Sequence, residues 1–303
     1  MKILILGGTS FFGKEAAKLF HKEGFKVTLF TRGNQRPTDL PPVQQIRGDR
    51  NLPGHLKQLA EQGPWDLLLD NIAYDGMAVR NVLSSLKGKV RRYMLTSTVS
   101  VYRYTLNQYP QPLEESVVDY DYRPPEEDLN DVHWKYRRGK LEAEKQLIQQ
   151  AEIPWTVFRP TIVYGPEDPL KRGFWYLARL IDGRPISLAN GGVASFRLAY
   201  SKDVARCFLL AAQTDCSIAK IYNIAGQECI TLRDFIDESA KCLGCKASLV
   251  NVPGDQLTEE QAGPYGKVVN LIPDISAAKR DLSFKPTPFQ TMIRDTAKWF
   301  SAL

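Results

Sequence analysis

The chain has 303 residues, 43% of them hydrophobic and 24% charged, so it is long enough to bury a substantial core and too apolar to be disordered. Lys and Arg together number 40 against 34 Asp and Glu, and the resulting net charge of +6 suits an anionic ligand. The sequence nevertheless lacks the long basic runs of a dedicated nucleic-acid-binding protein.

Segments that would mark a secreted, membrane or metal-binding protein are not evident. The apolar start MKILIL meets Gly7 and Gly8 too soon for a signal peptide, and no stretch approaches the roughly 18 apolar residues of a membrane span. Five cysteines, an odd number, do not indicate a disulfide framework, and Cys242 and Cys245 lack the second ligand pair of a zinc site. We therefore expect a soluble, cytoplasmic protein without a bound metal.

In the first half of the chain, short β-branched or Leu-rich runs alternate with helical patterns. This alternation is typical of an α/β fold in which a doubly wound parallel sheet carries helices on both faces. The predicted strands are 2–6, 26–30, 43–47, 66–69, 92–97 and 155–160, and the predicted helices are 11–23, 52–62, 76–86 and 135–151.

A glycine turn joins the first strand to the first helix, in ILILGGTSFFGKEAAKLF. Residues without a Cβ allow a tight turn and a close approach of a pyrophosphate, and the helix that follows supplies free N–H groups. The alternative is a tight turn in some other doubly wound protein. We predict that a dinucleotide contacts Gly7, Thr9, Ser10, Phe11, Phe12 and Gly13.

The end of the second strand selects between the two nicotinamide cofactors. An acidic residue there would accept hydrogen bonds from the adenosine ribose, whereas an arginine pairs with a 2′-phosphate. The strand ends in LFTRGN, which favours NADP over NAD through Arg32, although an exposed turn arginine is the alternative. After the third strand, Asp49 is placed to accept from the adenine amino group, and Arg50 beside it adds positive charge.

The segment 103–131 interrupts the regular order and is rich in Pro and acidic residues. Because a loop of this length inside a compact domain is usually functional or disordered, we interpret it as a lid or a substrate-side insertion.

The helical stretch 132–147, VHWKYRRGKLEAEKQL, alternates charges as a solvent-exposed helix does. Tyr136 and Lys140 are nevertheless one helical turn apart, so their side chains can reach the same point. The spacing alone leaves both interpretations open, a surface helix or half of an active site.

Beyond RPTIVYGPEDP the pattern becomes irregular, which indicates a smaller mixed lobe. Helical patterns occupy 173–182, 201–212, 231–243 and 287–301, with short strands near 196–200, 220–224 and 247–251. We predict a dinucleotide-binding Rossmann domain at 1–165 and a substrate lobe at 166–303, with segments near 196–226 returning to the Rossmann domain.

Seven motifs in order resemble the extended short-chain dehydrogenase/reductase family, also called the NAD-dependent epimerase/dehydratase family. The glycine turn and the second strand further resemble an atypical branch that includes chloroplast stem-loop-binding proteins and bacterial reductase-like proteins. The motifs are GGTSFFG, GDR, LTSTVSVY, YRRGK, FRPTIVYGP, YSKDVA and YNIAG.

The resemblance implies catalytic roles for Tyr136, Lys140 and Thr98. Tyr136 would move a proton to or from a substrate hydroxyl, Thr98 would hold the substrate oxygen, and Lys140 would bind the nicotinamide ribose and lower the Tyr136 pKa. One ammonium about 4 Å away, at an effective dielectric near 20, supplies the roughly 4 kcal/mol that a shift of about three pKa units requires.

Several positions depart from the family pattern. Ser10 occupies the middle glycine position, so its side chain must turn away from the pyrophosphate or donate to it. Arg103 stands where many members have Gly, and Thr161-Ile162 replace a pair that often includes the Asn that helps bind a nucleotide-sugar phosphate. Sugar 4,6-dehydratases carry Asp-Glu after the Thr, whereas this chain has Val99 and Ser100, so dehydration is not expected.

Three residues are predicted to bind substrate. Arg159 ends the sixth strand, at the carboxyl edge where ligands of open α/β sheets bind. Arg172 and Trp175 begin the second lobe and could grip a phosphate, a carboxylate or a flat ring. A surface helix anchored by a buried Trp is the alternative for the latter two.

We interpret the chain as an NADP-preferring oxidoreductase or epimerase that acts on a hydroxyl or carbonyl of a small, sugar-like molecule. The alternatives are an RNA-binding protein that holds the cofactor, and a regulator that holds NADP and docks a partner. A homodimer is left open, and the sequence specifies neither the substrate nor the reaction direction.

Overall fold

A parallel sheet of seven strands, in the order β11-β6-β5-β4-β1-β2-β3, forms the centre of the larger domain. The computed structural model describes residues 1–303 except 36, 122–132, 151, 267–268 and 303. The strands are β1 (Lys2–Leu6), β2 (Lys26–Thr31), β3 (Gln44–Arg47), β4 (Leu67–Asp70), β5 (Tyr93–Thr96), β6 (Trp155–Pro160) and β11 (Lys220–Ile224).

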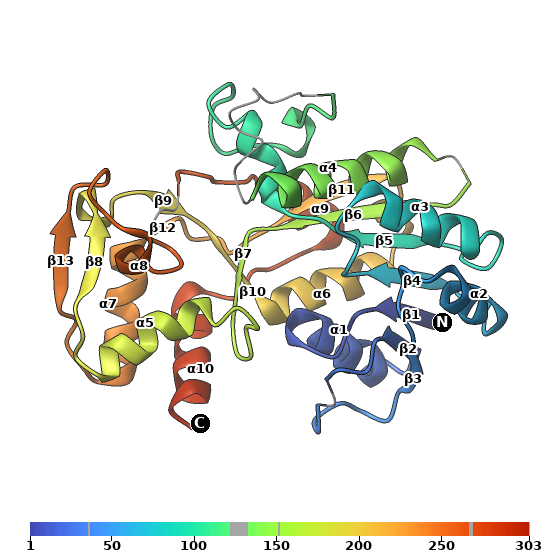
Figure 1. Ribbon diagram of the computed structural model, residues 1–303, viewed down its shortest axis with the longest axis horizontal. Helices are drawn as coiled ribbons and strands as arrows, with labels where there is room; N and C mark the ends of the chain where they lie inside the picture. The colour runs from blue at the N-terminus through green and yellow to red at the C-terminus, as the bar shows by residue number, and fades with distance from the viewer. Residues whose placement is uncertain (36, 122–132, 151, 267–268, 303) are drawn as a thin grey trace.

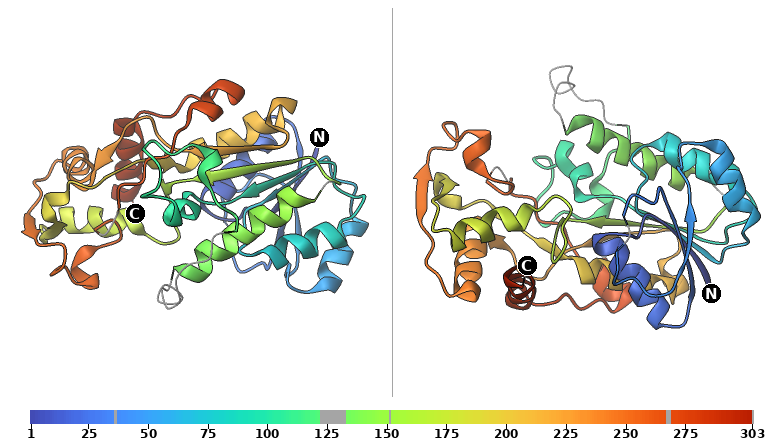
Figure 2. Two further views of the ribbon diagram at one scale, coloured as in Figure 1. Left: turned by 90° about the horizontal axis from the view of Figure 1, so that it is seen from above. Right: turned by 60° about the horizontal axis from the view of Figure 1, so that its bottom comes forward.

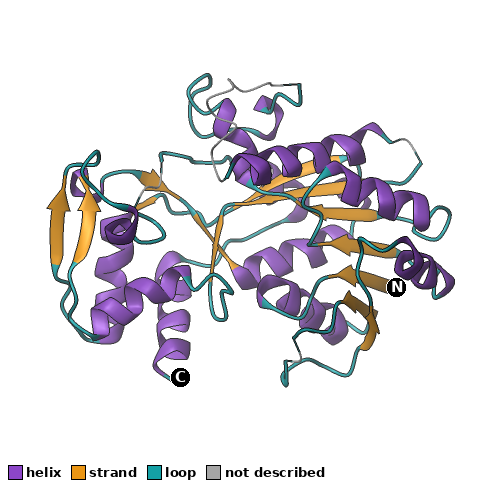
Figure 3. Cartoon of the chain, viewed as in Figure 1, coloured by secondary structure: helices purple, strands orange, loops and turns teal. Residues whose placement is uncertain are grey.

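Helices cover both faces of this sheet (Figures 1 and 3). Because alternate side chains of a strand point to opposite faces, Ile3 and Ile5 enter one core while Leu4 and Leu6 enter the other. One face carries α1 (Phe11–Lys22), α6 (Ser201–Ala212) and α9 (Ser276–Leu282), and the other carries α2 (Pro53–Glu61), α3 (Gly76–Ser85) and α4 (Trp134–Gln149).

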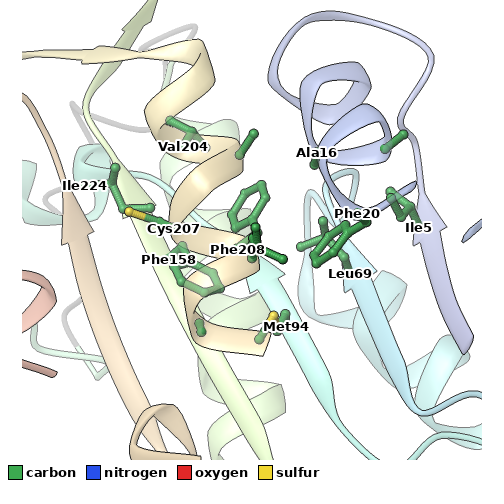
Figure 4. Close-up of a cluster of buried hydrophobic side chains, with 14 of the residues drawn as sticks. Ile5, Ala16, Phe20, Leu69, Met94, Phe158, Val204, Cys207, Phe208 and Ile224 are labelled. Carbon is green, nitrogen blue, oxygen red and sulfur yellow. The ribbon is translucent and has the colours of Figure 1, made fainter. Parts of the chain in front are cut away.

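The core under α1 and α6 is aromatic. Figure 4 shows Phe208 of α6 beside Phe158 of β6, with Phe20 of α1 nearby over Leu69. The ring centroids of Phe158 and Phe208 lie 5.0 Å apart in an edge-on arrangement, which suits the quadrupoles of both rings. This packing explains why the central strands read as continuous apolar runs.

The second lobe lies at the end of the molecule opposite the N-terminus in both views of Figure 2. It has its own core, which includes Tyr176, Phe235 and Tyr265. Its elements are α5 (Arg172–Ile181), β8 (Ile186–Ala189), β9 (Ser195–Phe196), β12 (Ile230–Thr231), α7 (Leu232–Leu243), β13 (Leu249–Val252), α8 (Glu259–Ala262) and α10 (Phe289–Ser301).

The predicted strands and helices are confirmed to within one or two residues at most ends. Two later segments join the larger domain, since α6 packs on α1 and β11 pairs with β6. The helix α9 also returns to it, which the sequence pattern did not indicate. Short pieces such as β8 and β7 (Ile162–Tyr164) were not predicted either, although β10 (Leu198–Tyr200), which pairs with β7, lies within the predicted strand near 196–200.

The loop 103–131 is only partly covered, because 122–131 lie outside the described residues. The short helices η1 (Val99–Tyr104) and η2 (Glu115–Val117) bound its described part. Tyr102, Leu106 and Leu113 form a small core there, and Leu113 N–H donates to the Ile272 carbonyl at 2.8 Å. This portion is therefore anchored, and closure over a ligand stays a prediction.

Within the described part of the chain, no helix is both long and apolar enough to cross a membrane. The same residues contain no group of three or more His, Cys, Asp or Glu side chains arranged to hold a metal ion. All five cysteines are free, and Gly244, with φ +69°, ends α7 as the predicted C-cap.

Candidate active site

The turn between β1 and α1 depends on three glycines. Gly7 and Gly8 have φ values of +86° and +113°, which favour glycine, and a Cβ on Gly8 would lie 3.0 Å from the Leu29 side chain. A Cβ on Gly13 would lie 3.1 Å from the Gly8 Cα, so α1 packs directly on the turn. Ser10 replaces a glycine without strain, because its φ of −148° is ordinary extended backbone.

A groove of about 610 Å³ runs over this turn. The Ser10 hydroxyl makes no cap bond to α1, so the first N–H groups of the helix are left for a ligand. Asn71, at the end of β4, lines the groove with a buried Nδ2 that lacks a partner among the described residues. A glycine cradle, open N–H groups and a free amide donor fit a dinucleotide pyrophosphate. Of the predicted cofactor residues, Gly7, Thr9, Ser10, Phe11, Phe12, Arg32, Asp49 and Arg50 line the groove.

The far end of the groove carries Arg32 and Asp49. Arg32 is exposed, and no described residue bonds to its guanidinium; only its backbone carbonyl is engaged, accepting from Arg47 Nε at 3.0 Å. The Asp49 carboxylate accepts from Asn51 N–H at 2.9 Å, while its own N–H donates to His55 Nδ1 at 3.0 Å. One positive and one negative side chain are thus held where the adenosine end of a dinucleotide would lie.

The predicted role of Arg50 needs correction. Its guanidinium donates to Asp70 Oδ1 at 2.6 Å and to the Ala78 carbonyl at 2.8 Å, and the side chain is buried. Tyr93 donates to the other Asp70 oxygen at 2.5 Å. The positive charge of Arg50 is therefore neutralised by Asp70. Its side chain stabilises the wall of the groove and adds no charge for a ligand.

The structure brings Tyr136 and Thr98 together beside the groove. The Thr98 side chain lies close enough to the Tyr136 phenol to lower its pKa, and Tyr136 remains 39% exposed. Thr98 is the N-cap of η1, its Oγ1 accepting from Ser100 N–H at 3.2 Å and donating to the Ser100 Oγ at 3.2 Å. The Thr98 hydroxyl, which is bonded to that of Ser100, therefore lies beside a partly exposed tyrosine.

Lys140 is almost fully buried behind this pair. Its Nζ donates to the Thr96 carbonyl at 2.8 Å and lies 4.8 Å from the centroid of the Tyr74 ring. Burial lowers the Lys140 pKa to about 8, against the opposing effect of Asp70. Tyr74 also lines the groove, and its ring centroid lies 6.4 Å from that of Tyr136, so it connects the groove to Tyr136 and Thr98.

The expected lowering of the Tyr136 pKa by Lys140 is not found. Burial is the largest influence and raises the Tyr136 pKa, whereas the nearby Thr98 side chain and the charge of Arg172 lower it. Among the described residues Lys140 does not act on this phenol, since its ammonium points to the Thr96 carbonyl. Additional positive charge is therefore needed before the phenol ionises near neutral pH.

Gly139 explains how α4 comes this close. A Cβ at this position would overlap the Tyr74 carbonyl oxygen, and one at Gly76 would press on the backbone of Glu142 at 3.1 Å. Two glycines therefore let α4 sit directly on the loop that follows β4, which places Tyr136 and Lys140 next to Tyr74, a residue that lines the groove.

The interpretation of α4 as a solvent-exposed helix is wrong for one face, and Arg159 is not a substrate ligand. Glu144 and Arg159 are both fully buried and form an ion pair at 2.6 Å. Arg159 Nη1 also donates to the Tyr102 hydroxyl at 2.9 Å, and Tyr120 donates to Glu144 at 2.8 Å. Arg159 thus ties β6 to α4, because a buried cation requires such partners.

The other two predicted substrate ligands are also engaged within the protein. Arg172 donates to Asp168 at 2.9 Å and to the Val163 carbonyl at 2.8 Å. Its guanidinium is therefore a fixed charge near Tyr136 and is not free to bind a substrate. Trp175 packs against Gly263 and lies 3.6 Å below the Arg179 guanidinium. The Trp-anchored helix interpretation therefore describes Trp175.

Sequence reasoning missed Asn71, Tyr74 and Ser100. A usable signal existed for Asn71, which directly follows β4 at the carboxyl edge of the sheet. Tyr74 and Ser100 carry no motif, and only the packing of α4 and η1 reveals their positions.

Comparisons with known proteins agree with this geometry. The NAD-dependent epimerase/dehydratase family matches residues 3–225. The chain is 28% identical, over 94% of its length and 75% of the other protein's, to the chloroplast stem-loop binding protein of 41 kDa b from Arabidopsis thaliana.

Two solved structures have a similar fold. One is a UDP-glucose 4-epimerase with UDP-glucose from Thermotoga maritima, with a TM-score of 0.81 and 18% identity over 100% of this chain and 99% of that one. The other is a UDP-glucuronic acid 4-epimerase with NAD from Bacillus cereus, with a TM-score of 0.77 and 21% identity over 100% and 97% of the two chains.

Proposed function

Since the chain belongs to the NAD-dependent epimerase/dehydratase family, we propose that it is an NADP-preferring oxidoreductase or epimerase acting on a hydroxyl or carbonyl group of a small, sugar-like molecule. The observation that carries the proposal is that the Tyr136 phenol lies next to the Thr98 side chain and, through the ring of Tyr74, beside the glycine groove. An accessible phenol next to a second hydroxyl is suited to proton transfer at a substrate oxygen.

In this proposal the groove holds a nicotinamide dinucleotide, which supplies a hydride acceptor or donor when bound. The glycine turn with Thr9 and Ser10 binds the pyrophosphate, and Asp49 accepts from the adenine amino group. Arg32 supports a preference for NADP, because its guanidinium is exposed and not engaged by described residues. Lys140, held behind Tyr74, binds the nicotinamide ribose.

The protein groups then divide the work at the substrate. Tyr136 gives a proton to, or takes one from, the reacting oxygen, and Thr98 orients that oxygen. Arg172 is the fixed positive charge that acts on the phenol, whereas the ammonium of Lys140 is held by the Thr96 carbonyl. Because burial raises the Tyr136 pKa in the chain alone, ionisation of this phenol depends on the positively charged oxidised nicotinamide.

The proposal is tested by titrating the protein with NADPH and NADH, followed by fluorescence, and by assaying cofactor turnover with a panel of hydroxyl and carbonyl compounds. We expect tighter binding of NADPH than of NADH, and turnover that Tyr136→Phe removes. Tyr109→Phe, at an exposed tyrosine outside the site, is the matched control. Absence of binding of either cofactor would contradict the proposal.

A second candidate function is RNA binding, supported by the stem-loop-binding name of the Arabidopsis relative and by the net charge of +6. The adjacent basic residues Arg91 and Arg92 contribute little to an RNA-binding surface. Arg92 is buried and donates to Thr156 at 3.1 Å, and Arg91 pairs with Asp66. Stem-loop RNA binding that weakens steeply with added salt would support this function. Failure to bind RNA even at low salt would exclude it.

A further inference from the structure

Lys14 of α1 is joined to two loops that are far apart in the sequence. Its ammonium lies 2.9 Å from each carboxylate oxygen of Asp39, in the segment between β2 and β3. The same ammonium forms an ion pair with Glu167, in the segment between β7 and α5. Because the Lys14 side chain is only 3% exposed, a buried cation is held here by one carboxylate from each loop.

Both loops form walls of the 610 Å³ groove. Gly33, Asn34 and Gln35 line it from the segment that contains Asp39, and Pro169 lines it from the segment that contains Glu167. Figure 1 shows this second segment, between β7 and α5, beside α1. Lys14 itself is not among the described lining residues, so it is placed to act on a ligand only through the two loops.

The two carboxylates differ in what else holds them. Asp39 also accepts from Lys18 Nζ at 2.5 Å, and its hydrogen bonds with Lys14 and Lys18 lower the Asp39 pKa to about 2. Among the described residues, Glu167 has its ion pair with Lys14 and none with Lys18. Loss of the Lys14 charge therefore releases both loops, whereas loss of the Lys18 charge leaves the Glu167 pair intact.

The segment between β7 and α5 requires an anchor for a conformational reason. Glu167 and Lys171 have φ values of +61° and +50°, a left-handed region that is unfavourable for residues with a Cβ. Such conformations persist only where surrounding contacts hold them. In the same segment Asp168 fixes the guanidinium of Arg172, the charge that acts on the Tyr136 phenol. The position of this loop therefore affects the catalytic end of the groove.

We propose that Lys14 is a positioning residue for cofactor binding, which holds the loops of Asp39 and Glu167 against α1 at the same time. This inference rests on the proposed function, because the ligand retained between the loops is the nicotinamide dinucleotide. The Asp39 loop follows Arg32 at the adenosine end, and the Glu167 loop leads into α5 at the catalytic end. One ammonium thus links both ends of the groove, and it acts on NADPH and NADH alike because neither ion pair involves the 2′-phosphate.

The first test compares cofactor binding by Lys14→Met and Lys18→Met in the full chain. Asp39 and Glu167 are 47% and 39% exposed, so water can solvate the carboxylates that Lys14→Met leaves unpaired, and the fold is retained. Fluorescence titration should give dissociation constants of Lys14→Met raised by about 10-fold for NADPH and NADH, since a hydrogen bond between charged groups contributes that much. Lys18→Met should change both far less, and Lys14→Arg, which keeps the charge, should recover most of the loss.

Hydrogen exchange followed by mass spectrometry provides a second measurement that needs no cofactor. Lys14→Met should raise exchange in the peptides that contain Asp39 and in those that contain Glu167 together. Lys18→Met should raise it only around Asp39, and Glu167→Gln only around Glu167. These patterns distinguish the release of one loop from the release of both.

The outcomes separate this inference from the proposed function. Arg91→Gln, at an arginine with 76% side-chain exposure, controls for the loss of one positive charge and should bind both cofactors as the wild type does. If the wild type binds neither cofactor, the proposed function is contradicted, and joint exchange of the two loops would still establish Lys14 as their common anchor. A Lys14→Met variant that binds both cofactors as tightly as the wild type, or exchanges faster in one loop alone, would overturn the inference.

Discussion

Two polar regions that each include a residue of α4 differ in how their groups are satisfied. In the buried network of Glu144, Arg159, Tyr102 and Tyr120, every charged group is bonded to another side chain. At the site around Tyr136, the Asn71 amide, the Thr161 hydroxyl and the Arg103 guanidinium find no partner among the described residues. The comparison shows that a polar group suited to binding a ligand differs from a structural one less in residue type than in whether other protein groups already bond to it.

The largest expected effect comes from removing one tyrosine hydroxyl from each of these two regions, Tyr136 at the site and Tyr120 in the buried network. Tyr136→Phe should lower turnover by up to about 10⁴-fold, since general acid–base catalysis contributes that much, while the melting temperature and NADPH affinity stay close to wild type. Tyr120→Phe removes a hydroxyl from the buried network, so it should lower the melting temperature and leave turnover close to that of the wild type. Steady-state kinetics and thermal unfolding of both variants check this, and normal turnover by Tyr136→Phe would end the catalytic assignment.

Arg159→Leu should destabilise the fold by about 3–5 kcal/mol, because it leaves Glu144 buried and unpaired. The double variant Arg159→Leu with Glu144→Leu should recover part of this loss, since no charge then remains without a partner. Urea unfolding gives both values. A single variant as stable as the wild type would show that the network does not hold α4 against β6.

The lowered pKa of Lys140 should make the stability of the fold depend on pH. Its pKa is lowered from 10.5 to about 8 by burial, so below pH 8 its charge costs the folded state roughly 3 kcal/mol. Between pH 8 and 10.5 the unfolded chain binds more protons at this residue than the folded chain does, so its contribution to stability rises with pH. The free energy of unfolding of wild type minus that of Lys140→Met should therefore increase over this range. A difference that stays constant over this range would contradict the lowered Lys140 pKa.

The smallest effect concerns the cofactor. Arg32→Gln should weaken NADPH by about 10-fold and leave NADH nearly unchanged, because only the former carries a 2′-phosphate. Fluorescence titration of both cofactors against the wild type and the Arg91→Gln control measures this. Equal weakening of the two cofactors would assign Arg32 a structural role in the loop after β2.

Much of the architecture was readable from local pattern. The apolar run 2–6, the glycine turn and the amphipathic helix 11–23 each depend on side chains that are close in sequence, so their positions follow from periodicity and turn chemistry. The order of seven motifs was enough to recognise the family. Short elements such as α9 escaped, because they are stabilised by packing on α6 and β11 rather than by a pattern of their own.

The fate of each charged side chain depended on the assembled fold. Arg50, Arg159 and Arg172 read as ligand-binding arginines, yet Asp70, Glu144 and Asp168 engage them. Arg32 was predicted on the same kind of evidence, and no described residue bonds to its guanidinium. Whether a cation meets a carboxylate or open space is set by which chain segments pack together, and burial then makes that partnership obligatory. That information is absent from any single stretch of residues.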